Sequence, residues 1–297
     1  MAVLPNAQAA SPLRNVMYYD DGHTALPEDT TILQNITHVI MSFVDPSDLY
    51  NGTSNAYTPF IKTATEKQDG LVEEGRGGNF PLLMEELRNE LNSTGKGLSI
   101  AVPGRPEDVA VYSQYGSRIW KTVDFVNVMA YDLMNRRNNG TGHHASLTGA
   151  NDTITEYAGK LGLDPGKINL GFPFYAKFFE LEKGECSGPF GYEHCGRMCL
   201  NNFGDCHGNG IYLDMVKSFQ GAMDHGKFDE AEGAWWYIDT QHSPRNFFWA
   251  WDAPDTIEEK VTGIVNKRGL GGVMAWSLGE DSYDWARVKA MNAAITQ

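Results

Sequence analysis

A tyrosine and an aspartate, Tyr131 and Asp132, end an apolar stretch with the sequence VDFVNVMAYD. This stretch, residues 123–132, is typical of a short strand buried on both faces, as in a parallel sheet covered by helices. A phenol and a carboxylate at the carboxyl end of such a strand can hydrogen-bond a polar ligand, because ligands bind at that end of parallel α/β sheets. The alternative is a core strand that ends in an ordinary polar turn.

Six apolar segments of this kind alternate with helical patterns, which favours an α/β fold with a parallel sheet of the (β/α)8 barrel type. They are residues 14–19, 37–44, 97–102, 123–132, 168–175 and 272–278. Helices are expected near residues 79–91, 107–120, 153–161, 255–267 and 283–294. Because a complete barrel of this type has eight strands, these six predict an incomplete one.

Composition divides the chain into segments of different character. Residues 1–13 are expected to be an unstructured N-terminal segment, and residues 14–297 the barrel domain. Residues 177–253 contain every cysteine and two aromatic strands, AWWYI and FFWAW, so they predict a small α+β subdomain inserted before the last strand. The polar stretch 46–78 contains only a faint strand candidate near Tyr57–Ile61.

Acidic residues outnumber basic ones, with Asp+Glu 38 against Lys+Arg 24 and a formal net charge of −14 over 297 residues. This balance argues against nucleic acid or an anionic membrane as the main partner, whereas a neutral or cationic polymer is easily accommodated. There is no run of about 18 apolar residues, so no membrane span is expected. Neither a metal nor another cofactor is expected, and the sequence leaves the oligomeric state open.

Several features point to a secreted or cell-wall protein. Four cysteines fall in one short window and could form two disulfides, with a zinc site that includes His207 as the alternative. N-glycosylation sequons occur at five asparagines. No complete signal peptide is visible at the start, so we expect a leader that this chain lacks. The cysteines are Cys186, Cys195, Cys199 and Cys206, and the sequons begin at Asn35, Asn51, Asn92, Asn139 and Asn151.

Several segments together resemble glycoside hydrolase family 18, the chitinase family, and particularly its fungal branch. MAYDLMNRR resembles the family's M-x-Y-D strand end, LGFPFYAK its seventh-strand motif and RGLGGVMAWSLGEDSYDW its eighth strand. NVMYY, ITHVIMSF and LSIAVPG resemble strands one, two and five. The resemblance covers most of the chain, and it implies a barrel with an insertion between strands seven and eight.

The resemblance also implies a mechanism in which the substrate's own N-acetyl oxygen attacks the anomeric carbon, an exception to the usual scheme with two carboxylates. Tyr131 and Asp132 would hold the acetamido group, and Trp276 would form the floor of the subsite for the cleaved sugar. Sugar rings have apolar faces and polar rims, which suit flat aromatic side chains. The other expected substrate-binding residues are Met129, Tyr18, Phe43 and Tyr175. Packing in the core is the alternative for the three aromatic ones.

The family's fourth-strand signature, D-G-x-D-x-D-x-E, is not found in this chain. Its final Glu is the general acid that protonates the leaving oxygen. Asp69 and Gly70 begin in the same way, but the alternating aspartates do not follow. Strands three and four are therefore expected to be absent, and Glu73 and Glu74 are the substitute candidates for the acid, with solvated loop charges as the alternative.

Three functional interpretations follow from this pattern. The first is a chitinase-like hydrolase of β-1,4-linked N-acetylglucosamine polymers, which acts by substrate-assisted retaining hydrolysis if the chain is active. The second is an inactive chitin-binding lectin that keeps the aromatic groove. The third is a truncated gene product with neither activity. Chitin or chitooligosaccharides are the expected partner in the first two.

Overall fold

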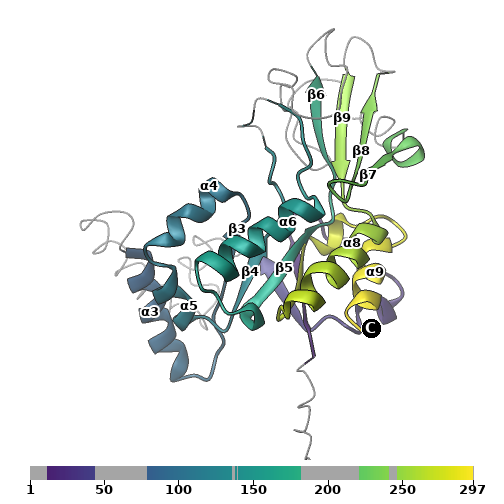
Figure 1. The fold of residues 1–297 in the computed structure, drawn as a ribbon. Coiled ribbons are helices and arrows are strands. Elements are labelled where there is room, and N and C mark those ends of the chain that lie inside the picture. The colour runs from purple at the N-terminus through teal and green to yellow at the C-terminus, as the bar shows by residue number, and fades with distance from the viewer. Residues whose placement is uncertain are drawn as a thin grey trace, which may run out of the picture.

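The computed structural model describes residues 12–43, 79–135, 138, 140–181, 221–240 and 246–296. Its main feature is a six-stranded parallel sheet in the order β2-β1-β10-β5-β4-β3. The strands are β1 (Arg14–Asp20), β2 (His38–Ser42), β3 (Ser99–Pro103), β4 (Phe125–Met129), β5 (Ile168–Pro173) and β10 (Gly272–Trp276). All six predicted strands are confirmed, and the curled sheet with its helices forms part of a (β/α)8-type barrel (Figure 1).

The main core lies between this sheet and the helices that follow its strands. Every residue of β5 is buried, as expected for a central strand covered on both faces. Helix α3 packs on α5, and α8 packs on both α6 and α9. These helices are α3 (Asn79–Asn92), α5 (Gly116–Thr122), α6 (Leu147–Ile154), α8 (Pro254–Lys260) and α9 (Ala286–Ala294). Helices α6 and α8 continue as the π-helical turns η4 (Thr155–Lys160) and η7 (Val261–Asn266).

The helix predicted near residues 107–120 is not one helix. The segment divides into α4 (Pro106–Val109), the 3-10 turn η3 (Ala110–Ser113) and α5. Gly116 opens α5 directly against the Trp120 ring, which a side chain at Gly116 would contact at 3.0 Å. The Trp120 indole in turn donates to the Leu161 carbonyl oxygen at 3.1 Å. Trp120 is 6% exposed and belongs to the main core.

The helix predicted near residues 153–161 begins earlier, at Leu147. Its start is set by Ser146, whose hydroxyl oxygen accepts a hydrogen bond from the backbone N–H of Gly149 at 3.0 Å. A serine at this position satisfies one of the N–H groups that a helix start leaves without a partner. The remaining short turns are η1 (Thr30–Leu33), η5 (Pro165–Lys167) and η8 (Leu278–Glu280).

In the described part of the chain, the parallel sheet ends at β2 on one side and at β3 on the other. Three apolar side chains on and after β2 are open to solvent, with exposures of 57% for Val39, 63% for Met41 and 74% for Phe43. In a closed barrel a further strand would pair with β2 on this side. Residues 44–78, which include the faint strand candidate, lie outside the described residues.

A second sheet of four antiparallel strands, in the order β6-β9-β8-β7, stands above the barrel (Figure 1). Its strands are β6 (Lys177–Leu181), β7 (Lys227–Asp229), β8 (Ala234–Asp239) and β9 (Asn246–Trp251). The two aromatic strands predicted in this part of the chain are β8 and β9, and they come between β5 and β10 in the sequence. The boundaries 177–253 for a subdomain, and 1–13 for an unstructured segment, stay predictions.

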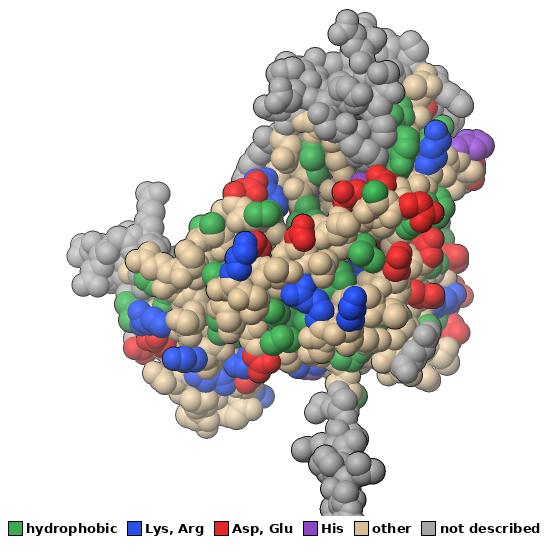
Figure 2. All heavy atoms as spheres, viewed as in Figure 1, with side chains coloured by type: hydrophobic (Ala, Val, Ile, Leu, Met, Phe, Trp, Pro, Cys, Tyr) green, Lys and Arg blue, Asp and Glu red, His purple; other side chains and the backbone are tan. Residues whose placement is uncertain are grey.

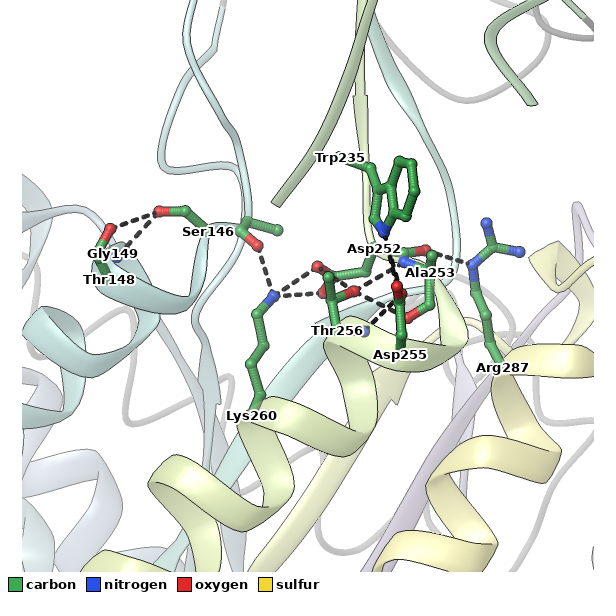
Figure 3. A network of polar contacts seen from close by, with 11 residues as sticks. Ser146, Thr148, Gly149, Trp235, Asp252, Ala253, Asp255, Thr256, Lys260 and Arg287 are labelled. Carbon is green, nitrogen blue, oxygen red and sulfur yellow. Dashed lines mark hydrogen bonds and ion pairs between the residues drawn. The ribbon is translucent and has the colours of Figure 1, made fainter. Parts of the chain in front are cut away.

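A buried ion pair and hydrogen bonds join the second sheet to the barrel (Figure 3). Asp252, which directly follows β9, accepts two hydrogen bonds of 2.6 Å from the Lys260 ammonium on α8. The same ammonium donates to the carbonyl oxygen of Ala145, and the Arg287 guanidinium on α9 donates to the carbonyl oxygen of Asp252 at 2.8 Å. These contacts tie the end of β9 to three segments of the barrel.

Acidic side chains gather on the right-hand part of the face in Figure 2, over α8 and α9. The exposed acidic residues of helix α8 are Asp255, Glu258 and Glu259. Helix α8 thus carries a local group of negative charges on the outside of the barrel. A surface of this kind repels phosphate backbones and anionic lipid head groups.

Candidate functional site

The carboxyl ends of the parallel strands bring the predicted site residues to one mouth of the barrel. Tyr18 lies on β1, Met129 ends β4, and Trp276 ends β10. Tyr131 and Tyr175 follow β4 and β5 by two residues each. All five belong to one apolar cluster, separate from the main core. Parallel strands end at the same edge of a sheet, which is why residues so far apart in sequence meet here.

Trp276 is flanked by two of the other predicted aromatic residues. Its ring centroid lies 5.4 Å from that of Tyr18 and 5.5 Å from that of Phe43, which stacks on it at an interplanar angle of 22°. Phe43 is 74% exposed, so core packing does not account for it. Tyr18 is 7% exposed, and its hydroxyl accepts a hydrogen bond from the Asn127 amide at 3.2 Å. The three rings form a partly solvent-facing aromatic surface at the mouth.

Asp132 adopts a left-handed backbone conformation with φ 56°, directly after Tyr131. Its Oδ1 accepts a hydrogen bond of 2.6 Å from the Tyr175 hydroxyl and lies 2.6 Å from the Lys177 ammonium. The Nδ1 atom of His144 is 3.6 Å from the same oxygen. The Lys177 and His144 side chains are 1% and 0% exposed, whereas that of Asp132 is 45% exposed. One side of the carboxylate is therefore anchored in the protein, and the other faces the mouth.

These contacts fix the charge state of the site. Burial favours a higher pKa for Asp132, but the imidazole of His144 nearby and the positive charge of Lys177 outweigh it and hold the pKa well below its usual range. Burial lowers the pKa of Lys177, and the Asp132 charge opposes this effect. Burial also lowers the pKa of His144, which favours the neutral imidazole. The anchored group is thus a carboxylate–ammonium pair, whose charges cancel, beside a neutral imidazole.

Tyr131 is 6% exposed, and its hydroxyl makes a contact of 3.8 Å with the Met274 sulfur. A thioether is a weak acceptor, so a ligand carbonyl could replace it as the partner of this hydroxyl. Burial raises the pKa of Tyr131 well above its ordinary value, and the Asp132 charge adds to this. The phenol therefore keeps its proton and is a hydrogen-bond donor at every physiological pH.

The sequence prediction missed two members of the site, Lys177 and His144. Lys177 follows Tyr175 by two residues, the spacing that puts side chains of an extended segment on one face, so its place beside Tyr175 could have been inferred. His144 lies in the loop NRRNNGTGHH, which has no periodic pattern. The backbone N–H of Leu133 donates to the His144 carbonyl oxygen at 3.0 Å, which holds the histidine beside Asp132.

Several sequence predictions fall outside the described residues. Glu73 and Glu74, the substitute candidates for the general acid, are among them, and so are all the cysteines. Across the described ranges, no group of three or more His, Cys, Asp or Glu side chains is arranged to hold a metal ion. The helices in those same ranges are all too short or too polar to cross a membrane.

Acid is expected to destabilise the protein partly through Asp132. Because its pKa is lowered on folding, the carboxylate stabilises the folded state above about pH 4, and this contribution is lost as the pH falls below that value. We expect the urea midpoint of the wild type to fall more steeply between about pH 5.5 and about pH 3 than that of Asp132→Asn. If the urea midpoint changes equally with pH in the two proteins, the lowered pKa of Asp132 is contradicted.

The fold and the mouth together define a (β/α)8-type protein with an aromatic surface and an anchored carboxylate at the carboxyl ends of its strands. A family model, that of the glycosyl hydrolases family 18, matches residues 67–281. The match spans most of the chain. The chain therefore belongs to the glycosyl hydrolases family 18, as its motifs indicated.

Curated relatives support this assignment. Endochitinase 1 of Metarhizium robertsii is 28% identical over 231 residues, which are 71% of this chain and 50% of the relative. The chain thus spans about half the length of the curated relatives it matches. Among solved structures, the catalytic domain of chitinase B from Arthrobacter TAD20 is 26% identical, with a TM-score of 0.55 over 73% of this chain and 50% of that one.

A second structural neighbour establishes the likeness of the fold. The Group IV chitinase of Ostrinia furnacalis superposes with a TM-score of 0.69 over 97% of this chain and 100% of that chain. The sequence identity is 17%.

Proposed function

We propose that this chain acts on β-1,4-linked N-acetylglucosamine polymers, that is chitin or its oligosaccharides, by substrate-assisted retaining hydrolysis. The observation that carries the proposal is that Trp276 shares one cluster at the mouth with Tyr175, whose hydroxyl donates to the anchored Asp132 carboxylate. An aromatic ring stacks on the apolar face of a sugar, and a carboxylate beside it can accept the N–H of an acetamido group. The matched charges of Asp132 and Lys177 suit a neutral ligand.

In the proposed reaction, the acetamido oxygen of the bound sugar forms a bond to the anomeric carbon while the glycosidic C–O bond breaks. The Tyr131 hydroxyl donates to the acetamido oxygen and orients it, and Asp132 accepts the acetamido N–H. Asp132 also stabilises the positive charge that develops on the acetamido group, because it is held ionised in a fixed position. The leaving oxygen takes its proton from a general acid, for which Glu73 and Glu74 are the candidates in this sequence.

Release of a fluorogenic aglycone from a chitooligosaccharide, followed from acid to neutral pH, tests the proposed hydrolysis. We expect release above that of a heat-killed control, and we expect Asp132→Asn to lower it on the order of 10²–10³-fold. If Glu73 or Glu74 is the acid, its replacement by glutamine should lower the rate on the order of 10²–10⁴-fold. Release that equals the heat-killed control at every pH would exclude hydrolysis by this chain.

The second candidate function is non-hydrolytic binding of chitin, as in a lectin. It is favoured by one feature of the sequence: the family's D-G-x-D-x-D-x-E signature, which ends in the general acid, is not found, whereas Tyr131, Asp132 and Trp276 are present. A pull-down on insoluble chitin, performed together with the hydrolysis assay, separates the two functions. Retention without hydrolysis identifies a lectin. A cooperative thermal transition would exclude the third interpretation, a truncated product that does not fold.

Trp276→Ala is expected to weaken binding of N-acetylchitotetraose by roughly 10-fold or more, because the alanine cannot stack on a sugar face. Isothermal titration calorimetry measures the change. Phe80→Ala is the control, because Phe80 is a 40% exposed aromatic residue on α3, outside the cluster at the mouth. Equal losses in both variants, or none in Trp276→Ala, would contradict the assignment of Trp276 to the sugar-binding surface.

We further propose that the protein works outside the cell or in the cell wall. The cysteine window and the sequons support this location, and among the sequon asparagines Asn35 and Asn92 are exposed in the structure. Expression with an added secretion signal in a eukaryotic host should yield protein that carries N-glycans. Mass spectrometry before and after enzymatic deglycosylation measures the mass of the attached glycans. An unchanged mass would contradict glycosylation.

A further inference from the structure

A chain of four hydrogen-bonded polar side chains crosses the parallel sheet below the mouth. It begins at Arg14, the first residue of β1, and runs through Asn169 on β5 and Asn127 on β4 to Tyr18 on β1. Both asparagines are 0% exposed, and the parallel register places them opposite each other on adjacent strands. Buried amides are costly unless they are hydrogen-bonded, so the partners of these two side chains matter.

The buried amide of Asn127 lies on the inner face of the curled sheet. Asn127 stands between Val126 and Val128, which both belong to the core under the helices. Because side chains alternate between the two faces of a strand, Asn127 faces the other way. Met129, two positions further along β4, belongs to the apolar cluster at the mouth. The polar chain therefore runs inside the barrel, one layer of side chains below the mouth.

The hydrogen bonds along this polar chain all run in one direction. Nε of Arg14 donates to Oδ1 of Asn169 at 2.9 Å, and Nδ2 of Asn169 donates to Oδ1 of Asn127 at 2.8 Å. Nδ2 of Asn127 then donates to the Tyr18 hydroxyl oxygen at 3.2 Å. A guanidinium can only donate, so the first amide must present its oxygen to Arg14 and its nitrogen to the second amide. The second amide follows in the same way, so Arg14 sets the direction of the whole chain.

Contacts outside the polar chain hold Arg14 in place. Its Nη2 donates to the Gly166 carbonyl oxygen at 2.8 Å, and its guanidinium carbon lies 5.2 Å from the centre of the Phe125 ring. Two glycines leave the space that this side chain needs. A Cβ on Gly271 would overlap Arg14 Nη2, and a Cβ on Gly272 would lie 2.7 Å from Arg14 Cβ. The donor that starts the chain is therefore fixed in position.

The polar chain ends in a Tyr18 hydroxyl that still has its hydrogen to donate. Asn127 occupies the accepting side of this hydroxyl, so the hydrogen must point elsewhere. Among the residues that the structure describes, the Tyr18 hydroxyl donates no hydrogen bond. Burial raises the pKa of Tyr18, so the phenol keeps this hydrogen at neutral pH. The Tyr18 ring lies 5.4 Å from that of Trp276, so a sugar stacked on Trp276 would bring acceptor oxygens close to it.

We propose that Asn169 and Asn127 are positioning residues, which make the Tyr18 hydroxyl an obligate hydrogen-bond donor to the bound sugar. The acceptor is an oxygen of the sugar unit that stacks on Trp276. A hydroxyl free to rotate could accept from a sugar hydroxyl as well as donate to one, whereas this one selects a ligand that presents an acceptor. The contact with sugar rests on the proposed function, but the direction of the polar chain does not.

Asn169→Asp is expected to reverse the end of the polar chain without changing its shape. The new carboxylate accepts from Arg14 and has no hydrogen to donate, so Asn127 must turn its Nδ2 toward position 169 and its Oδ1 toward Tyr18. The Tyr18 hydrogen is then used inside the protein. The new charge is paired with the Arg14 guanidinium. Asn127→Asp, whose carboxylate accepts directly from Tyr18, has the same effect and replaces the first variant if that one does not fold.

Carbon-13 NMR of protein labelled at tyrosine Cζ tests the direction of the chain without any sugar. The Tyr18 resonance is assigned by its absence from Tyr18→Phe. In Asn169→Asp and in Asn127→Asp we expect this resonance to move downfield, because the hydroxyl loses the bond that it accepts and donates to residue 127 instead. A Tyr18 resonance that stays in its wild-type position in both variants overturns the proposal.

The control for the NMR experiment is Asn151→Asp, which makes the same chemical change elsewhere. Oδ1 of Asn151, on α6, also accepts from an arginine side chain, that of Arg268, at 2.9 Å. This variant should leave the Tyr18 resonance unmoved and the affinity for sugar within about 2-fold of wild type. An equal movement of the Tyr18 resonance in Asn151→Asp and Asn169→Asp also overturns the proposal.

Calorimetric titrations with N-acetylchitotetraose measure the consequence for binding. We expect Tyr18→Phe to weaken binding roughly 5-fold, the effect of one hydrogen bond, and Asn169→Asp to weaken it as much. The double variant should bind no more weakly than Tyr18→Phe alone, whereas independent effects would multiply to roughly 25-fold. Independent effects overturn the positioning role of Asn169. If the wild type binds no sugar, the proposed function fails, while the NMR experiment still decides the direction of the chain.

Discussion

Lys260→Met is expected to lower the free energy of unfolding by about 3–5 kcal/mol, because it leaves the Asp252 carboxylate buried without its counter-charge. Asp252 and Lys260 are 0% and 2% exposed in their side chains, and both Asp252 oxygens lie 2.6 Å from the ammonium (Figure 3). Burial lowers the pKa of Lys260, but the adjacent Asp252 opposes the shift and favours the charged amine. Urea unfolding at neutral pH measures the loss.

Two further variants make the Lys260 experiment specific. Lys160→Met breaks an i,i+4 pair with Glu156 in which the lysine is 67% exposed, and it should change stability by no more than about 0.5 kcal/mol. The double variant Lys260→Met, Asp252→Leu should recover much of the loss, since no unpaired charge remains buried. If Lys260→Met is no worse than Lys160→Met, the ion pair does not stabilise the junction between the second sheet and the barrel.

Asp132→Asn is expected to weaken binding of N-acetylchitotetraose by about 10- to 100-fold, which corresponds to the roughly 1.5–3 kcal/mol of a hydrogen bond to a charged group. The asparagine also leaves the buried Lys177 ammonium without its counter-charge, so the positions of Lys177 and Tyr175 change with it. Where hydrolysis is detected, the rate should fall on the order of 10²–10³-fold, because the developing positive charge loses its anion.

The same strand provides the control for Asp132→Asn. Asp124 lies just before β4, at its opposite end, and its carboxylate is 2.7 Å from the Arg88 guanidinium. Asp124→Asn therefore removes an ion-paired carboxylate of the same strand without touching the mouth. Affinity for the tetrasaccharide should stay within about 2-fold of wild type. If both variants bind as the wild type does, Asp132 does not contact the acetamido group.

The sequence was sufficient for those parts of the protein that depend on local pattern. Apolar segments of about six residues predicted all six strands of the parallel sheet, because a strand buried on both faces must be apolar throughout. The change from apolar to polar residues at Tyr131 and Asp132 placed them beyond the end of β4, where the structure has them. The order of the motifs was enough to indicate the family.

Local pattern failed where long-range contacts decide the structure. The helix predicted near residues 107–120 breaks before Gly116, and Trp120 in α5 donates to the Leu161 carbonyl oxygen, some 40 positions along the chain. The loop that contains His144 has no sequence pattern that could have indicated this residue, although His144 is fully buried beside Asp132. Nothing in a sequence window carries such information, since neither contact is made between neighbours in the chain.

The sequence by itself determined which strands exist, that they are buried parallel strands, and which polar groups lie at their ends. Only the tertiary structure decided which polar groups meet. It placed Lys177 and His144 on Asp132, and it joined Arg14 to Tyr18 through two buried asparagine amides. The physical reason is that hydrogen bonds and ion pairs act over a few ångströms, and the register of parallel strands, set by the whole sheet, determines which side chains come that close.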